Sequence, residues 1–219
     1  MAVIEGGSSA ALAGVAVEAA SGMHMIQKPI AYGALGHYRI TYRAVLAAAQ
    51  AANGRLFEAR NNHASNLVIP TRLIIRVLQI AAGTAQENSV DVYKCTAFTA
   101  VDTTNTTTPV ASRKRSSMAA APGSLDLRGV TLAGAAAGMT GGTLTKDTSA
   151  FASLPFNVAA AINTNGPWGP LDVLDDVNGT HPWVFVQNEG FIIENRVLNV
   201  TSYGCAIFVD FSWAETTLF

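Results

Sequence analysis

The sequence predicts an all-β fold, an antiparallel sandwich of the jelly-roll type with an N-terminal arm and a long central loop. Apolar and polar residues alternate with a period of two in several segments, which is typical of half-buried strands. Roughly eight such segments alternate with turn-rich connections, as they do in sandwiches and jelly rolls. The clearest of them, residues 203–215, predicts that a core strand closes the sheet near the C-terminal end.

The first 34 residues are expected to form an extended arm, and residues 35–219 the sandwich domain. The arm is built from small residues, and Leu12 and Val15 belong to a weak helical stripe that is too small for a core of its own. Glycines and Pro29 then interrupt the chain. We expect the arm to be disordered when free and to pack on a partner through Leu12, Val15 and Tyr32.

Four strands are predicted in the first half of the sandwich. They cover residues 36–45, 56–60, 66–80 and 89–98. In the first, Tyr38, Ile40 and Tyr42 share one face, and basic or hydroxyl residues share the other. A helix is the rival for residues 71–80, but their Ile and Val content favours a strand. Pro70 predicts an edge position or a bend within that strand.

The middle of the chain, residues 99–150, is rich in Thr, Ala and Gly and is expected to be mainly a long loop. Only residues 124–128 and 130–132 have the pattern of ordered segments. A loop of this length inside a domain is often functional. Its basic triplet Arg113, Lys114 and Arg115 could bind phosphate, form a solvated turn or form salt bridges between subunits.

Further strands are predicted at residues 156–158, 183–186, 190–198 and 203–213. Trp213 lies on the apolar face of the last one and is expected in the core. Trp168, in a Gly- and Pro-rich stretch, is expected to be exposed and to anchor an interface or a sugar. Cys95 and Cys205 are expected to be buried thiols, although a disulfide between neighbouring strands stays open.

The composition favours a protein whose surfaces are buried against other subunits. Charged residues make up 13% of the chain, against about 25% in typical domains. A neutral, Thr-rich surface is the alternative explanation. The formal net charge of −1 makes nucleic acid an unlikely main partner, because nucleic-acid binders carry a basic excess. No run reaches the roughly 18 apolar residues that a membrane helix needs.

Motifs for catalysis, cofactors or metals are not found in the sequence. The four histidines have no metal-ligand spacing, and no nucleophile elbow, phosphate loop or dinucleotide fingerprint occurs. Asp172, Asp175 and Asp176 form an acidic cluster, but its spacing matches no calcium loop, so a solvated turn is favoured. The sequence therefore predicts a protein that is not an enzyme and needs no cofactor or metal.

Several stretches resemble a family of tailed-bacteriophage virion structural proteins. The similarity covers roughly residues 30–219 and is carried by residues 32–38, 83–87, 98–102, 113–118, 187–193 and 209–215. In these proteins a similar "Ala-Gln-Glu … Phe-Thr-Ala-x-Asp … Arg-x-Ser-Met" order precedes an "Asn-Glu-Gly-Phe-x-Ile" strand and a final "Val-Asp-x-x-Trp-Ala-Glu". The resemblance implies a capsid-associated β-sandwich and a location in the virion, assembled in the host cytoplasm.

Three functional hypotheses follow, of which an enzyme of unknown type is the least favoured. The first is a capsid decoration or cement protein that stabilises the shell through subunit contacts, with itself and with the major capsid protein or other virion proteins as partners. A homo-oligomer is expected, and three-fold sites on icosahedral shells make a trimer attractive. The second is a carbohydrate- or receptor-binding component of a head fibre or tail that uses the region of Trp168.

Overall fold

A computed structural model of the chain describes residues 35–114, 122–162, 167–174, 182–201 and 204–217. The expected arm, with Leu12, Val15 and Tyr32, lies outside these ranges, and so does Arg115. Among the described residues there is no helix that could span a bilayer.

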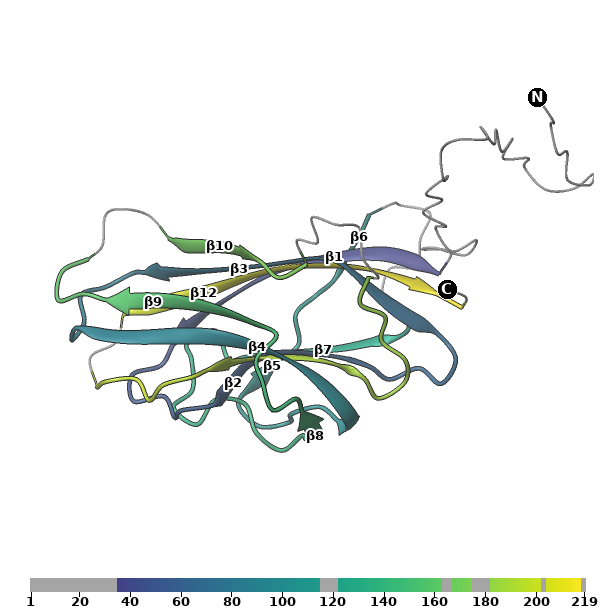
Figure 1. The fold of residues 1–219 in the computed structure, drawn as a ribbon, viewed down its shortest axis with the longest axis horizontal. Helices are drawn as coiled ribbons and strands as arrows, with labels where there is room; N and C mark the ends of the chain where they lie inside the picture. The colour runs from purple at the N-terminus through teal and green to yellow at the C-terminus, as the bar shows by residue number, and fades with distance from the viewer. Residues whose placement is uncertain (1–34, 115–121, 163–166, 175–181, 202–203, 218–219) are drawn as a thin grey trace, which may run out of the picture.

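Two antiparallel sheets pack face to face as a β-sandwich (Figure 1). Sheet A holds, from edge to edge, β10 (Trp168–Asp172), β3 (Leu67–Gln79), β12 (Cys205–Thr216), β1 (Gly36–Leu46) and β6 (Ser112–Arg113). Sheet B holds β5 (Thr106–Thr107), β7 (Leu125–Val130), β2 (Gly54–Asn61), β11 (Gly190–Asn195), β4 (Gln86–Ala100) and β8 (Thr143–Lys146). Strand β9 (Ala152–Val158) pairs with the first half of β4. The predicted all-β sandwich is confirmed.

Eight of these strands form the frame of the sandwich. Sheet A contributes β1, β3, β10 and β12, and sheet B contributes β2, β4, β9 and β11. Along the chain, every step between successive frame strands crosses from one sheet to the other except the step from β4 to β9, which are neighbours in sheet B. The remaining short strands, β5 to β8, all lie in the connection between β4 and β9.

The last strand occupies the centre of sheet A. Strand β12 pairs with β1 on one side over the full length of β1, and with β3 on the other. The register of β3 shifts between Arg72 and Pro70, where Thr71 is the extra residue. Because proline lacks an N–H donor, such an irregularity accommodates it within a strand. The edge position or bend predicted at Pro70 thus takes the form of a register shift in an inner strand.

Aromatic rings fill the space between the sheets. Trp213 is fully buried, and its ring stacks on Tyr38 and Phe211 with centroids 5.6 and 5.0 Å apart. Phe211 of sheet A meets Phe191 of sheet B edge-on at 5.1 Å. The indole N–H of Trp213 donates to Glu215 at 3.2 Å, which satisfies its only polar atom. The core position predicted for Trp213 is confirmed.

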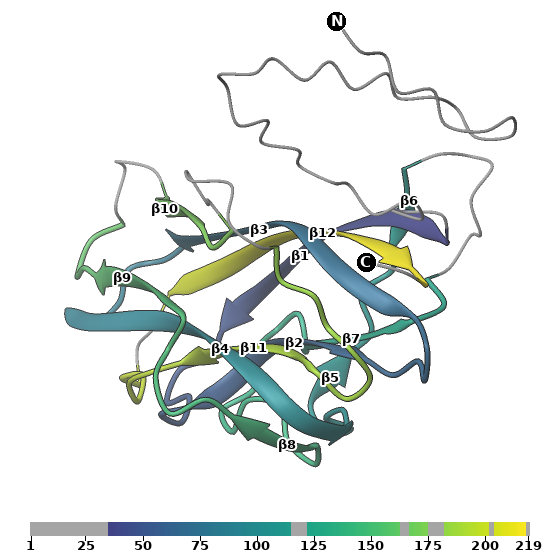
Figure 2. The ribbon, with the colours of Figure 1, turned by 45° about the vertical axis from the view of Figure 1, so that its right-hand side comes forward.

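The connection between β4 and β9 is more ordered than its composition predicts. It covers the outer face of sheet B (Figure 2), where a second, smaller core forms from Cys95, Phe98, Val101 and Ile192. Strand β6 of this connection also extends sheet A by pairing with β1. Cys95 lies in this second core and Cys205 in the main one, so both are buried free thiols.

Two local predictions differ from the structure. Residues 183–186 form no strand, and only a single bridge joins Phe185 to Val68. Their apolar run instead packs Trp183 and Phe185 onto Phe191, which explains the strand-like composition. Trp168 is not in an exposed loop: it begins β10, opposite Val77, and is half-buried.

Candidate functional site

Four connections meet at one end of the sandwich, which we call the loop end. Within the part of the chain that the structure describes, they are residues 47–53, 80–85, 159–162 with 167, and 196–201 with 204. The strand register brings them together, because the last residue of β1 and the last residue of β3 both lie opposite Cys205, the first residue of β12. In sheet B, the end of β11 lies opposite the start of β2. The loop end thus joins residues that are far apart in the sequence.

The loop end is nearly free of charge. In the sequence of its four connections, Arg196 is the only charged residue, and alanine is the most frequent one. Large apolar side chains are exposed there, namely Ile80, Ile162, Val197 and Leu198, of which Leu198 is 57% exposed. Depletion of charge is the compositional mark of the centre of a protein interface. The described part of the loop end is therefore an apolar and nearly uncharged surface.

Buried amide side chains hold these connections in place. Gln50, Gln79, Asn88, Asn195 and Asn199 are all at most 5% exposed. The side-chain nitrogen of Gln79 donates to the carbonyls of Ala159 and Ala161 at 2.7 and 3.1 Å. Its side-chain oxygen accepts from the backbone N–H of Ala159 at 3.2 Å. One side chain at the end of β3 thereby fixes the connection between β9 and β10.

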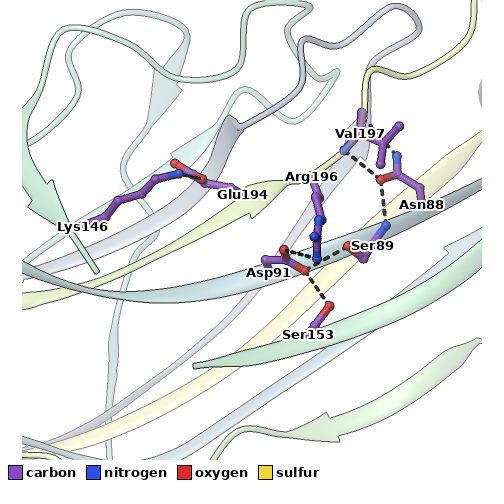
Figure 3. Close-up of polar contacts among 8 residues, drawn as sticks. All are labelled: Asn88, Ser89, Asp91, Lys146, Ser153, Glu194, Arg196 and Val197. Atoms are coloured by element: carbon purple, nitrogen blue, oxygen red, sulfur yellow. Dashed lines mark hydrogen bonds and ion pairs between the residues drawn. The ribbon is translucent and has the colours of Figure 1, made fainter. Parts of the chain in front are cut away.

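A cluster of three asparagines fixes the opposite side of the loop end. Asn88 Nδ2 donates to Asn195 at 2.9 Å and to Asn199 at 2.8 Å. Asn199 in turn donates to the carbonyl of Ala47 at 2.9 Å, which ties residues 196–204 to residues 47–53. Asn88 Oδ1 also accepts from the backbone N–H of Val197 (Figure 3). Because these buried amides are hydrogen-bonded to one another, they rigidify the loops.

The one charged residue of the loop end is directed to sheet B. Arg196 lies 3.6 Å from Asp91, whose carboxylate also accepts hydrogen bonds from Ser89 and Ser153 at 2.9 and 2.6 Å (Figure 3). The same picture shows the ion pair of Lys146 with Glu194 on the neighbouring strand. The charge of Arg196 is thus partly neutralised by Asp91, and the exposed side chains next to it, Val197 and Leu198, are apolar.

A second group of charges is buried beneath the connection between β4 and β9. Glu58 Oε1 accepts from the backbone N–H of Asp102 at 2.6 Å, and Asp102 lies 3.0 Å from Arg55. Burial, and then the negative charge of Asp102, raise the pKa of Glu58 to about 7. Asp102 also accepts from the N–H of Gly142 at 2.6 Å. These contacts join the connection to sheet B, which is a structural role.

The structure separates the site residues that the sequence predicted. Arg113 and Lys114 are exposed at β6, one edge of sheet A, and Trp168 lies in β10 at the opposite edge. Trp168 packs on Phe156, with ring centroids 5.9 Å apart, so it is half-buried and not exposed as predicted. The interface role of these residues stays a prediction. None of them belongs to the loop end.

The sequence analysis did not identify the individual residues of the loop end, although it noted the high alanine content and low charge of the chain. Which alanine-rich turns meet is decided by strand order, which a single sequence does not contain. In the described ranges, no group of three or more His, Cys, Asp or Glu residues is placed to hold a metal ion. Asp172 caps a turn by accepting from the N–H of Leu174 at 3.2 Å, and Asp175 and Asp176 lie outside the described ranges.

Comparison of the chain with models of protein families, with curated proteins and with solved structures finds no match in any of the three.

Proposed function

We propose that this chain is a structural protein of a bacteriophage virion, which decorates or cements the capsid shell through subunit contacts. The observation that carries the proposal is the loop end: a nearly uncharged surface with exposed Ile80, Ile162, Val197 and Leu198. Hydrogen bonds of buried amides already hold its described residues in place, which lowers the entropic cost of docking. Subunit packing in a shell requires surfaces of this kind.

We further propose that the sandwich is a jelly roll. The order β1–β12–β3–β10 in one sheet and β2–β11–β4–β9 in the other supports this assignment, because the chain alternates between two four-stranded sheets. Jelly rolls are frequent in viral capsid proteins and in lectins. Together with the sequence resemblance to virion proteins, the strand order favours a place in the particle, assembled in the host cytoplasm, with the chain itself and the major capsid protein as partners.

The loop end is tested through the oligomeric state of the protein. The wild-type chain is expected to form a homo-oligomer, for which a trimer is our working model, when its mass is measured by light scattering. Leu198→Asp places a charge at the loop end and is expected to give monomers and to abolish binding to purified capsid shells. Val110→Asp is the matched control, because Val110 is 89% exposed in the connection between β4 and β9.

Retention of the oligomer and of shell binding by Leu198→Asp would contradict the assignment of the loop end. A wild-type monomer that does not bind shells and is absent from purified particles would contradict the function itself. Mass spectrometry of purified virions provides the last measurement.

Carbohydrate binding is a second candidate function, favoured by a hollow of about 380 Å³ between β4 and residues 182–190. Trp183 lies on one side, and Lys94 Nζ lies 5.0 Å from its ring centre. Asp147 and Glu189 provide hydrogen-bonding groups in the same hollow. An aromatic ring next to carboxylates is suited to a sugar. A glycan array with wild-type protein and Trp183→Ala tests it, and equal binding by both would exclude this site.

A further inference from the structure

The outer face of sheet A carries an ordered group of arginines. Strand β12 lies between β1 and β3, and the register of the three strands arranges their outward residues in rows. Three successive rows are Arg39–Ser212–Arg72, Thr41–Asp210–Ile74 and Arg43–Phe208–Arg76. Two arginines thus flank the first row and two flank the third. The spacing of strands and residues places their Cα atoms at the corners of a rectangle of about 10 by 13 Å.

A single carboxylate lies at the centre of these arginines. Asp210 is 3.4 Å from Arg39 and 3.0 Å from Arg76, and it accepts a hydrogen bond from Thr41 at 2.7 Å. Burial alone would raise the pKa of Asp210, but the hydrogen bonds from Thr41, Arg76 and Arg39 outweigh it and lower the pKa. Asp210 is therefore ionised at neutral pH and neutralises one of the four positive charges.

The other two arginines remain available. Arg43 lies over the ring of Phe208, with its guanidinium carbon 5.7 Å from the ring centre. Arg72 is exposed and forms no ion pair with any residue in the described ranges. The acid nearest this face on the neighbouring strand is Asp172 of β10, at the edge beside Ile74. The face therefore keeps an excess of positive charge on a chain whose net charge is −1.

The arginines of this face are accessible: Arg39, Arg43 and Arg72 are exposed, and Asp210, Ser212 and Ile74 are buried between them. In Figures 1 and 2, sheet A has sheet B on one side, and no described strand lies over its other side. The side chain of Arg39 is 48% exposed even though it is bound to Asp210. Between the arginines lies the partly exposed ring of Phe208, so the face is partly apolar as well as basic.

We propose that the outer face of sheet A is a docking surface for a protein segment that carries carboxylate side chains. Guanidinium groups bind carboxylates through charge-assisted hydrogen bonds, and Asp210 accepts one from each of Arg39 and Arg76 within the chain. Ser212 is small and uncharged, so no carboxylate of β12 occupies the row between Arg39 and Arg72. An incoming Glu or Asp would complete that row as Asp210 completes the next.

A protein partner fits this surface better than a nucleic acid does. All four cations are arginines, which are enriched at protein interfaces, whereas lysines are depleted there. A continuous phosphate backbone would be repelled by the central Asp210. Its bases would find only one ring for stacking, Phe208, which Arg43 already covers. This inference does not depend on the proposed virion function, because it rests on the charges of sheet A alone.

The test uses the full chain and a fluorescein-labelled oligoglutamate peptide as the probe, with oligothymidylate of equal length for comparison. Binding is followed by fluorescence anisotropy at low ionic strength and repeated at increasing salt, which screens such contacts. Wild-type protein is expected to prefer oligoglutamate. Arg43→Gln/Arg72→Gln is expected to weaken that binding about tenfold, because two guanidinium contacts are lost while the ion pairs of Asp210 stay intact.

The matched control is Arg60→Gln/Arg128→Gln, which removes the same charge from β2 and β7 of sheet B. It is expected to change the affinity less than about twofold. Thermal melts confirm first that both double variants fold. Equal loss in the two variants, tighter binding of oligothymidylate, or no peptide binding by the wild-type protein would each overturn the proposal.

Discussion

The outer faces of the two sheets are opposite in character. On sheet B, the connection between β4 and β9 buries Phe98 and Ile192 together with the carboxylates of Glu58 and Asp102. On sheet A, Arg39, Thr41 and Arg43 of β1 are exposed in alternation, and Arg72 is exposed on β3. A sheet face that another segment of the chain covers thus carries apolar side chains and enclosed charges, whereas an uncovered face carries long side chains with solvated ends.

The ionisable groups of the two sheets differ in burial. Several of those of sheet B are buried and act within the fold, as in the contacts of Asp102 with Glu58, Arg55 and Gly142. Those of sheet A are exposed in excess of their partners and can act between proteins. The predictions below test this difference, beginning with the largest expected effect.

The same truncation on the two faces should have unequal effects. Phe98→Ala removes a fully buried ring beneath the connection and is expected to lower the free energy of unfolding by about 3–5 kcal/mol. Phe208→Ala removes a partly exposed ring from the open face and is expected to cost less than about 1.5 kcal/mol. Urea denaturation measures both, and equal losses would mean that sheet A is also covered.

The buried carboxylate Glu58 should make stability depend on pH. Below its ordinary pKa of 4.5, Glu58 is protonated in the folded and unfolded chain, and its burial has no electrostatic cost. As the pH rises to about 7, only the unfolded chain ionises, so the free energy of unfolding falls by about 3 kcal/mol and then stays constant. Glu58→Gln keeps the acceptor for the N–H of Asp102. The difference in stability between variant and wild type should therefore grow from pH 4.5 to 7 in chemical denaturation, and a constant difference would contradict this cause.

Asp210, the carboxylate on the outer face of sheet A, should contribute less to the free energy of unfolding. Asp210→Asn leaves Arg39 and Arg76 without their acid and is expected to lower the free energy of unfolding by about 1 kcal/mol at neutral pH. Because the pKa of Asp210 is lowered, its contribution is present above pH 3.8 and is lost as the pH falls through the folded pKa. Asp172→Asn, at the edge of the same sheet, is the control and should change stability by less than about 0.5 kcal/mol. Equal effects of the two changes would argue against the central role of Asp210.

The two cysteines report on opening of the covered face. Burial raises the pKa of both Cys95 and Cys205 to about 12, so neither should react with a thiol reagent in the native protein at neutral pH. Cys95 lies beneath the connection between β4 and β9, and Cys205 lies between the sheets. In dilute denaturant, Cys95 should react first if the connection opens locally. Single-thiol variants, Cys95→Ala and Cys205→Ala, separate the two rates, and faster reaction of Cys205 would place the weaker region in the main sandwich.

Strands with one face toward solvent could be predicted from the sequence. Residues 36–45 alternate because Tyr38 and Ile40 face the core while Arg39 and Thr41 face water, and this pattern needs no knowledge of a partner strand. Pro70 likewise predicts a local bend from its own chemistry. The short strands β5, β6 and β8 could not be predicted, because Thr- and Ser-containing segments there are ordered by pairing with β7, β1 and β4.

The arginine face of sheet A and the loop end depend on strand register, so they could not be predicted from the sequence. Arg39 and Arg43 share a face by simple alternation, and so do Arg72 and Arg76, but their meeting around Asp210 requires β12 to lie between β1 and β3. The loop end depends in the same way on which turns are neighbours. The prediction that Trp168 lies in a loop was based on its Gly and Pro neighbours. In the structure Trp168 pairs with Val77 and belongs to a strand.

The central position of β12 also has a consequence for synthesis of the protein. Its partners β1 and β3 leave the ribosome well before residues 205–216 have been translated, and during that interval their facing edges have no mate. Unpaired edges rich in Val and Ile are prone to join other chains. Sheet A can therefore assemble only after its final strand emerges, and a nascent chain stalled before residue 205 would be a substrate for chaperones or for aggregation.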